Sequence, residues 1–136
     1  MITEDYVSFE TAKLLKENGF NQPCKAIYSP KGVVRHFLKE EVYSHSLKGY
    51  KKLCPTLQMA MKWLREDKKI LISIFCHIDK GYWFCIQHFI NSPYKFATSE
   101  SIHRKEEILG KIQYYDTYEQ ACEAAIKYCL EKKLIF

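Results

Sequence analysis

The sequence predicts an α+β fold in which helices pack on an antiparallel sheet. Three observations favour this class. Three segments carry apolar side chains at helical spacing, several short runs are rich in β-branched and aromatic residues, and turn residues separate those runs. The elements follow the order helix, hairpin, helix, strands, helix. We therefore expect an antiparallel sheet of four to five strands and about three helices, at least two of them packed on one face.

Length and composition suit a single domain spanning residues 1–136. Of its 136 residues, 47% are hydrophobic and 15% aromatic, which is enough to form a core. The first residues are acidic and lack the apolar run of a secretion signal. No apolar run approaches the roughly 18 residues that span a bilayer. We therefore expect a cytoplasmic protein without membrane contact, whose six cysteines are reduced and mostly buried.

The first half of the chain predicts a helix, a hairpin and a loop. The first helix is expected to begin after the N-cap Ser8 and to end at Gly19. The stretch KAIYSPKGVVRHFL contains two β-rich runs separated by turn residues 29–32, which predicts a hairpin. Residues 39–53 are polar and predict a loop.

Two further helices are predicted from apolar stripes. Pro55 marks the entry of the middle helix, whose stripe comprises Leu57, Ala60, Met61 and Leu64. A capping box over residues 116–119 predicts the start of the last helix. The stripe of that helix comprises Tyr118, Ala121, Cys122, Ala125, Tyr128 and Cys129. Before it, YKFAT and KIQYY predict further strands on either side of the polar segment SESIHRKEEILG.

The runs ILISIFCHI and YWFCIQHFI predict a second hairpin around residues 79–81, with Gly81 in the left-handed conformation and Ile78 opposite Tyr82. Side chains alternate between the two faces of such a hairpin. One face is uniformly apolar and is expected against the helices. The other is mixed, and its aromatic strip comprises Phe75, Trp83 and Phe89. That strip could stack nucleic-acid bases or contact a protein, unless another part of the chain covers it.

The same hairpin raises the question of a zinc site, because thirteen positions contain Cys76, His77, Cys85 and His88. Alternation places these four side chains two on each face, and a two-residue connection would also keep them apart. A structural zinc ion needs four ligands around one point. Ligands from elsewhere in the chain could complete one of these pairs, but we expect no metal and no other cofactor.

The net charge of +5 is concentrated in residues 21–52, which carry seven basic and two acidic side chains. A localised basic patch suits an acidic partner, either nucleic acid or an acidic protein surface. The alternative is a lysine-rich loop that only faces solvent. The residues of this segment that we expect to bind are Lys48, Tyr50, Lys51 and Lys52.

The sequence contains no recognisable catalytic motif. Its five glycines occur singly, so no phosphate-cradling loop can be built from them. Neither a GxSxG elbow nor an HExxH pair occurs. A cysteine–histidine pair is the weakest alternative, because Cys122 and Cys129 lie on the apolar face of the last helix. We therefore do not expect an enzyme.

A family resemblance is carried by three segments, YVSFETAKLLKENGF, CPTLQMAMKWLRE and YDTYEQACEAAIKYCLEKKL. They resemble small proteins without established activity that phages, prophages and mobile elements of gut-type bacteria carry. The resemblance implies a genomic setting in which small non-enzymatic proteins often bind and disable host machinery, including CRISPR effectors. It assigns no functional residue.

Two functions follow as expectations. The first is an antagonist that binds a host defence protein or ribonucleoprotein in the bacterial cytoplasm, as anti-CRISPR proteins do. The second is a protein that binds single-stranded RNA or DNA. Both would use the basic segment together with the mixed sheet face, represented by Phe75, His77 and Trp83. Homodimerisation through the sheet is compatible with the sequence, although no residue pattern requires it.

Overall fold

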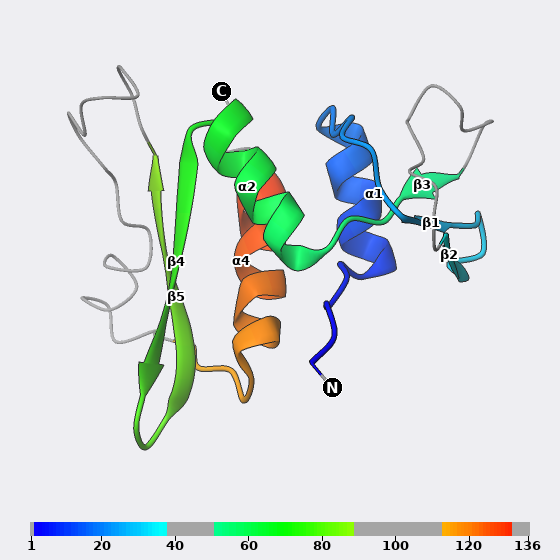
Figure 1. Cartoon of the computed structure of the whole chain (residues 1–136). Coiled ribbons are helices and arrows are strands. Elements are labelled where there is room, and N and C mark those ends of the chain that lie inside the picture. The colour runs from blue at the N-terminus through cyan, green and yellow to red at the C-terminus, as the bar shows by residue number, and fades with distance from the viewer. Residues whose placement is uncertain (1, 38–50, 89–112, 132–136) are drawn as a thin grey trace. The chain divides into compact units, whose positions relative to one another are not determined.

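The computed structural model describes residues 2–37, 51–88 and 113–131 (Figure 1). By its internal contacts the chain divides into two compact units, Met1–Ala60 and Met61–Phe136. The described ranges form an α+β fold with three helices and five antiparallel strands. The predicted class is therefore confirmed, with the strands arranged in one sheet of three and one of two. The expectation of a single domain stays a prediction.

The first unit opens with helix α1 (Phe9–Glu17). The hydroxyl of Ser8 accepts a hydrogen bond from the backbone N–H of Thr11 at 3.2 Å, as an N-cap does. After the helix, Gly19 adopts a φ of +89°, and the N–H of Phe20 donates to the carbonyl of Leu15 at 2.9 Å. Both predicted ends of this helix are confirmed.

The sheet of the first unit has strand order β2-β1-β3. The predicted hairpin is formed by β1 (Ala26–Tyr28) and β2 (Val34–His36). Strand β3 (Lys52–Leu53) pairs with β1, so the prediction of a loop over residues 39–53 is wrong at its end. The pairing is long-range and only two residues long, so local sequence gave no signal for it. Residues 38–50 lie outside the described part of the chain.

Helix α2 (Leu57–Asp67) begins after Thr56, whose hydroxyl accepts from the N–H of Met59 at 3.1 Å. The predicted stripe is confirmed as buried, and Trp63, which the prediction omitted, is buried as well. The division between the two units falls within this helix. None of the described helices is long and apolar enough to cross a membrane.

The second unit contains the hairpin of β4 (Ile70–His77) and β5 (Gly81–His88). Its two faces carry the predicted side chains, but the register differs. Tyr82 pairs with Cys76 and not with Ile78. The turn is closed by a hydrogen bond from the N–H of Lys80 to the carbonyl of His77, which shifts the connection to residues 78–80. Ile78, predicted on the apolar face, therefore lies at the tip and is 97% exposed.

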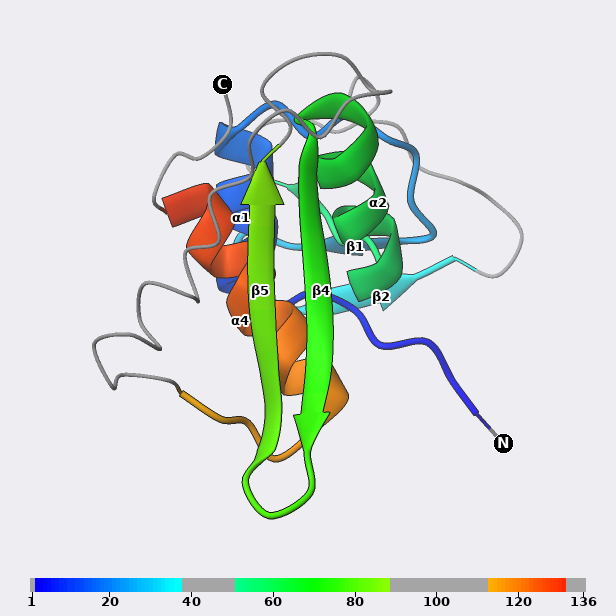
Figure 2. The ribbon, with the colours of Figure 1, turned by 90° about the vertical axis from the view of Figure 1, so that its left-hand side faces the viewer.

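Helix α4 (Tyr118–Glu131) packs against the apolar face of this hairpin and lies behind both strands in Figure 2. On the hairpin side the interface buries Ile70, Ile72, Phe84 and Ile86. On the helix side the buried residues are Ala121, Cys122, Ala125, Ile126, Cys129 and Leu130. The predicted stripe is thus confirmed in its small residues. Tyr118 is exposed and Tyr128 is half-buried, so both lie at its margin.

The capping box of α4 lies one residue later than predicted. The hydroxyl of Thr117 accepts from the N–H of Gln120, and the amide oxygen of Gln120 accepts from the N–H groups of Asp116 and Thr117. Gln120 therefore takes the role in the capping box that the prediction assigned to Glu119.

The predicted edge strand KIQYY is confirmed at one residue. Tyr115 forms an isolated antiparallel bridge with Tyr82, with N–H to carbonyl distances of 2.7 and 2.8 Å. A side chain at Gly81 would collide with the carbonyl oxygen of Tyr115, so the bridge requires glycine at that position. Residues 89–112, with the predicted strand YKFAT, lie outside the described part.

Candidate functional site

The exposed end of the β4–β5 hairpin extends past the start of α4 (Figure 2). Along β4 the buried residues lie at the start, at Ile70 and Ile72, and the last three, Phe75 to His77, are exposed. We call residues 75–83 the distal hairpin. Within the distal hairpin, the ring of Tyr82 contacts that of Tyr118 at the start of α4, with centroids 6.2 Å apart, whereas Phe75, Cys76 and Ile78 are exposed.

The most prominent feature of the distal hairpin is a pair of stacked aromatic rings. Phe75 and Trp83 are cross-strand partners, with ring centroids 4.5 Å apart and an angle of 23° between the ring planes. Phe75 is 44% exposed, and Trp83 is partly exposed. Both lie on the mixed face, as predicted. Phe89, the third member of the predicted strip, lies outside the described residues.

A second aromatic group adjoins this pair. The ring of Tyr114 lies 6.0 Å from that of His77, and the ammonium of Lys80 lies 5.6 Å from the Tyr114 centroid. The Tyr115–Tyr82 bridge brings Tyr114 to this position. We use the term aromatic face for Phe75, His77, Trp83 and Tyr114, with Lys80 at its margin.

Sequence reasoning included Phe75, His77 and Trp83 in the site but missed Tyr114 and Lys80. The predicted edge strand KIQYY was the available signal for Tyr114, because a strand beside β5 brings one of its two tyrosines to this face. For Lys80 the signal was the turn itself, which places its side chain next to the aromatic residues.

The basic segment belongs to the first unit and is described only in part. Lys48 and Tyr50 lie outside the described residues. Lys51 is exposed, whereas Lys52 is half-buried with its ammonium 5.3 Å from the ring centroid of Phe9. Lys52 is therefore engaged in packing as a β3 residue. The basic segment lies in the first unit and the aromatic face in the second.

Cys76 lies on one face of the hairpin and His77 and Cys85 on the other, as expected from alternation along the strands. Among the described residues, no group of three His, Cys, Asp or Glu side chains could hold a metal ion. Burial raises the pKa of Cys122 from 9.0 to about 11 and that of Cys129 to about 12. These two thiols therefore stay protonated at neutral pH.

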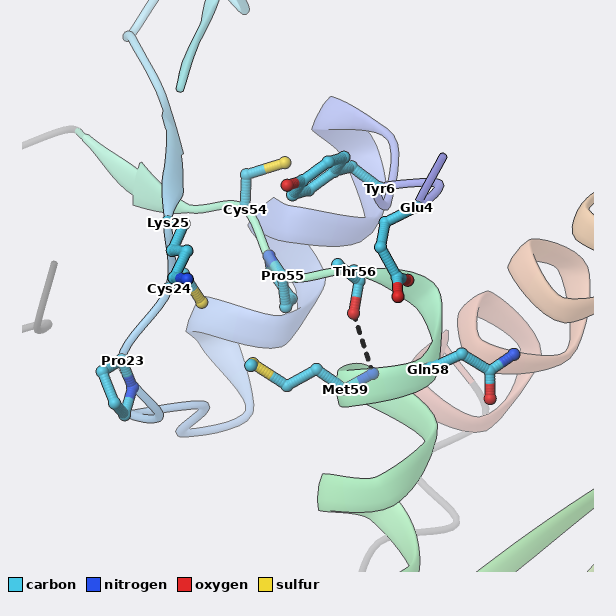
Figure 3. Close-up of a pocket in the computed structure, with 10 residues that line it drawn as sticks. All are labelled: Glu4, Tyr6, Pro23, Cys24, Lys25, Cys54, Pro55, Thr56, Gln58 and Met59. Atoms are coloured by element: carbon cyan, nitrogen blue, oxygen red, sulfur yellow. Dashed lines mark hydrogen bonds between the residues drawn. The ribbon is translucent and has the colours of Figure 1, made fainter. Parts of the chain in front are cut away.

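The first unit also contains an open pocket of about 300 Å³ that the sequence did not indicate (Figure 3). Three short segments supply its lining: the start of the chain, the approach to β1, and the β3–α2 connection with the first turn of α2. The lining residues are Glu4, Tyr6, Pro23, Cys24, Lys25, Cys54, Pro55, Thr56, Gln58 and Met59. All of them lie in the first unit.

Comparison with known proteins adds no relative: no protein-family model, no curated protein and no solved structure matches this chain. The resemblance to phage and mobile-element proteins therefore stays an expectation.

Proposed function

We propose that this is a small non-enzymatic binding protein that attaches to a partner protein through the aromatic face of its distal hairpin. The observation that carries the proposal is the partly exposed Phe75–Trp83 stack on a projecting hairpin. Aromatic side chains are enriched among the residues that dominate protein–protein binding energy. The exposed Ile78 at the tip would enlarge the apolar contact.

Charge favours a protein partner over nucleic acid at this surface. The described residues of the second unit carry six Lys or Arg side chains and seven Asp or Glu side chains. Affinity for nucleic acid depends mainly on neutralising phosphates, which requires a local excess of positive charge. Among the described residues of the distal hairpin, the charge of Lys80 is offset by that of Asp79, so these residues provide no such excess.

The identity of the partner is proposed from the resemblance of three segments to phage and mobile-element proteins. In that setting the partner is a host defence protein or ribonucleoprotein, encountered in the cytoplasm of the bacterial host. Antagonism would result from occupying a surface that the defence machinery needs. The geometry supports the binding step, and the resemblance supports the choice of target.

Binding of single-stranded RNA or DNA is the second candidate. The stacked pair next to Tyr114 and Lys80 favours it, because bases stack on aromatic rings and a nearby cation can contact the phosphate. Such binding would weaken steeply with salt. Replacing Lys48 and Lys51 together by Glu would abolish it if the basic segment takes part; Lys52 is left native because it packs on Phe9.

The test is recovery of partners from a lysate of a related bacterium, with and without nuclease treatment. The native chain is compared with Phe75→Ser, and with Val33→Ser as a control that removes an exposed apolar side chain from the first unit. We expect one protein to survive nuclease treatment on the native chain and on Val33→Ser, and to be lost from Phe75→Ser. Equal recovery on all three would refute the proposed surface, and recovery of nucleic acid alone would favour the second candidate.

A further inference from the structure

The pocket of the first unit has a buried apolar floor that backbone pairing holds in place. Cys24, Cys54 and Pro55 are buried. The N–H of Cys54 donates to the carbonyl of Ala26 at 2.9 Å, and the carbonyl of Pro55 accepts from the N–H of Val7 at 3.1 Å. Because these bonds join the β3–α2 connection to both of the other segments, the floor exists before any ligand arrives.

The walls of the pocket are apolar and of two kinds. Tyr6 is fixed by an antiparallel bridge to Thr56 and by an edge-on ring contact with His36 at 4.9 Å. Met59 is 37% exposed, and its unbranched thioether side chain can adjust to the shape of a ligand. One rigid and one adaptable wall suit a small apolar group placed between them.

Opposite charges lie at the rim. Glu4 and Lys25 occupy opposite sides of the pocket in Figure 3, and both residues are exposed. Neither side chain makes an ion pair with another residue of the described ranges. A ligand that carries one positive and one negative group would therefore meet a complementary charge at each side.

We infer that this pocket binds a small zwitterion with an apolar body, the chemistry of a free amino acid. The apolar side chain would lie against Tyr6 and Met59, the ammonium near Glu4 and the carboxylate near Lys25. A volume of about 300 Å³ is at the lower end of the range for ligand sites and has room for a free amino acid. The site is in the first unit, so the inference goes beyond the proposed function and does not depend on it.

The first experiment titrates the full-length native chain with L-phenylalanine and follows the methyl signal of Met59 by NMR, assigned with Met59→Leu. Two comparison compounds each lack one charge: phenethylamine has no carboxylate and 3-phenylpropionate has no ammonium. We expect a saturable shift with L-phenylalanine and weaker binding of both comparison compounds. No saturable shift up to about 10 mM, or equal binding of all three compounds, would overturn the inference.

Charge variants separate the two ends of the ligand. Because both rim charges are exposed, Glu4→Gln and Lys25→Gln should each weaken binding of L-phenylalanine by about two- to five-fold. Glu4→Gln should leave 3-phenylpropionate unaffected, since that compound has no ammonium. Glu17→Gln and Lys13→Gln, in the exposed part of α1, are the matched controls and should change nothing. Equal effects of pocket and control variants would show a non-specific charge effect and reject the site.

Discussion

The two faces of the β4–β5 hairpin are built from alternating residues of the same two strands, yet their composition and burial differ. The face toward α4 is aliphatic at its base, and Ile70, Ile72 and Ile86 are nearly inaccessible. The opposite face is aromatic, and its distal part is open, with Phe75 44% exposed. Each fully buried aliphatic side chain contributes about 1.5–3 kcal/mol to stability. A half-exposed ring contributes less, so the aromatic face is available for another role.

Removing one buried aliphatic side chain should destabilise the second unit more than any change on the aromatic face. Ile86→Ala should lower the free energy of unfolding by about 2–5 kcal/mol, because it leaves a cavity against α4. Chemical denaturation monitored by circular dichroism measures this change. A loss below about 1 kcal/mol would mean that the α4 face is not the core of the second unit.

The bridge between Tyr115 and Tyr82 beside the hairpin should depend on Gly81. Its φ of +104° and the close carbonyl of Tyr115 leave no space for a side chain. Gly81→Ala should cost about 1–3 kcal/mol and should separate Tyr115 from Tyr82. Hydrogen exchange at these two amides should become faster in the variant. Unchanged protection of both amides would contradict the bridge.

The buried thiols should make the second unit sensitive to high pH. Burial raises the pKa of Cys122 to about 11 and that of Cys129 to about 12 in the folded chain. Above pH 9, unfolded chains lose these thiol protons while the folded chain retains them, so stability falls as the pH rises from 9 toward 12. Between pH 7 and pH 10, the free energy of unfolding should fall less for the double variant Cys122→Ala/Cys129→Ala than for the native chain. Chemical denaturation at both pH values measures this. An equal difference would contradict the raised pKa values.

The aromatic face should tolerate substitution in the free protein. Phe75→Ala should cost about 1 kcal/mol, mainly through its lost stacking on Trp83. A loss as large as that of Ile86→Ala in the same denaturation assay would show that the stack belongs to the core.

The smallest effect on stability is expected at the tip. Ile78→Ser should change the free energy of unfolding by less than about 0.5 kcal/mol, because the side chain is 97% exposed. The same variant should weaken partner binding if the tip is part of the interface. A marked drop in melting temperature would indicate that Ile78 packs within the chain.

Local signals in the sequence predicted most of the elements. The caps at Ser8 and Gly19, the stripe of α2 and the alternation of the hairpin each depend on residues a few positions apart. Features that depend on distant pairing were missed or shifted. Strand β3 forms only because β1 lies beside it, and the hairpin register follows from the hydrogen bond that closes its turn.

The candidate site shows the same limit. Phe75 and Trp83 were predicted on one face, because alternation along a strand fixes the face on which a side chain lies. The two rings stack because Phe75 pairs with Trp83 across the hairpin. The predicted register differs from this pairing by two positions. The pocket of the first unit could not be predicted, since its lining comes from segments separated by long stretches of chain.

Site-specific photo-crosslinking can show whether the distal hairpin contacts a partner protein. A benzoylphenylalanine residue replaces Ile78 at the hairpin tip in one variant and Val33 in the first unit in another, since both positions are exposed. After irradiation in a lysate of a related bacterium, we expect a discrete, nuclease-resistant protein adduct from position 78 and none from position 33. An adduct only from position 33, or adducts at position 78 that disappear on nuclease treatment, would contradict the account of the distal hairpin as a protein-binding surface.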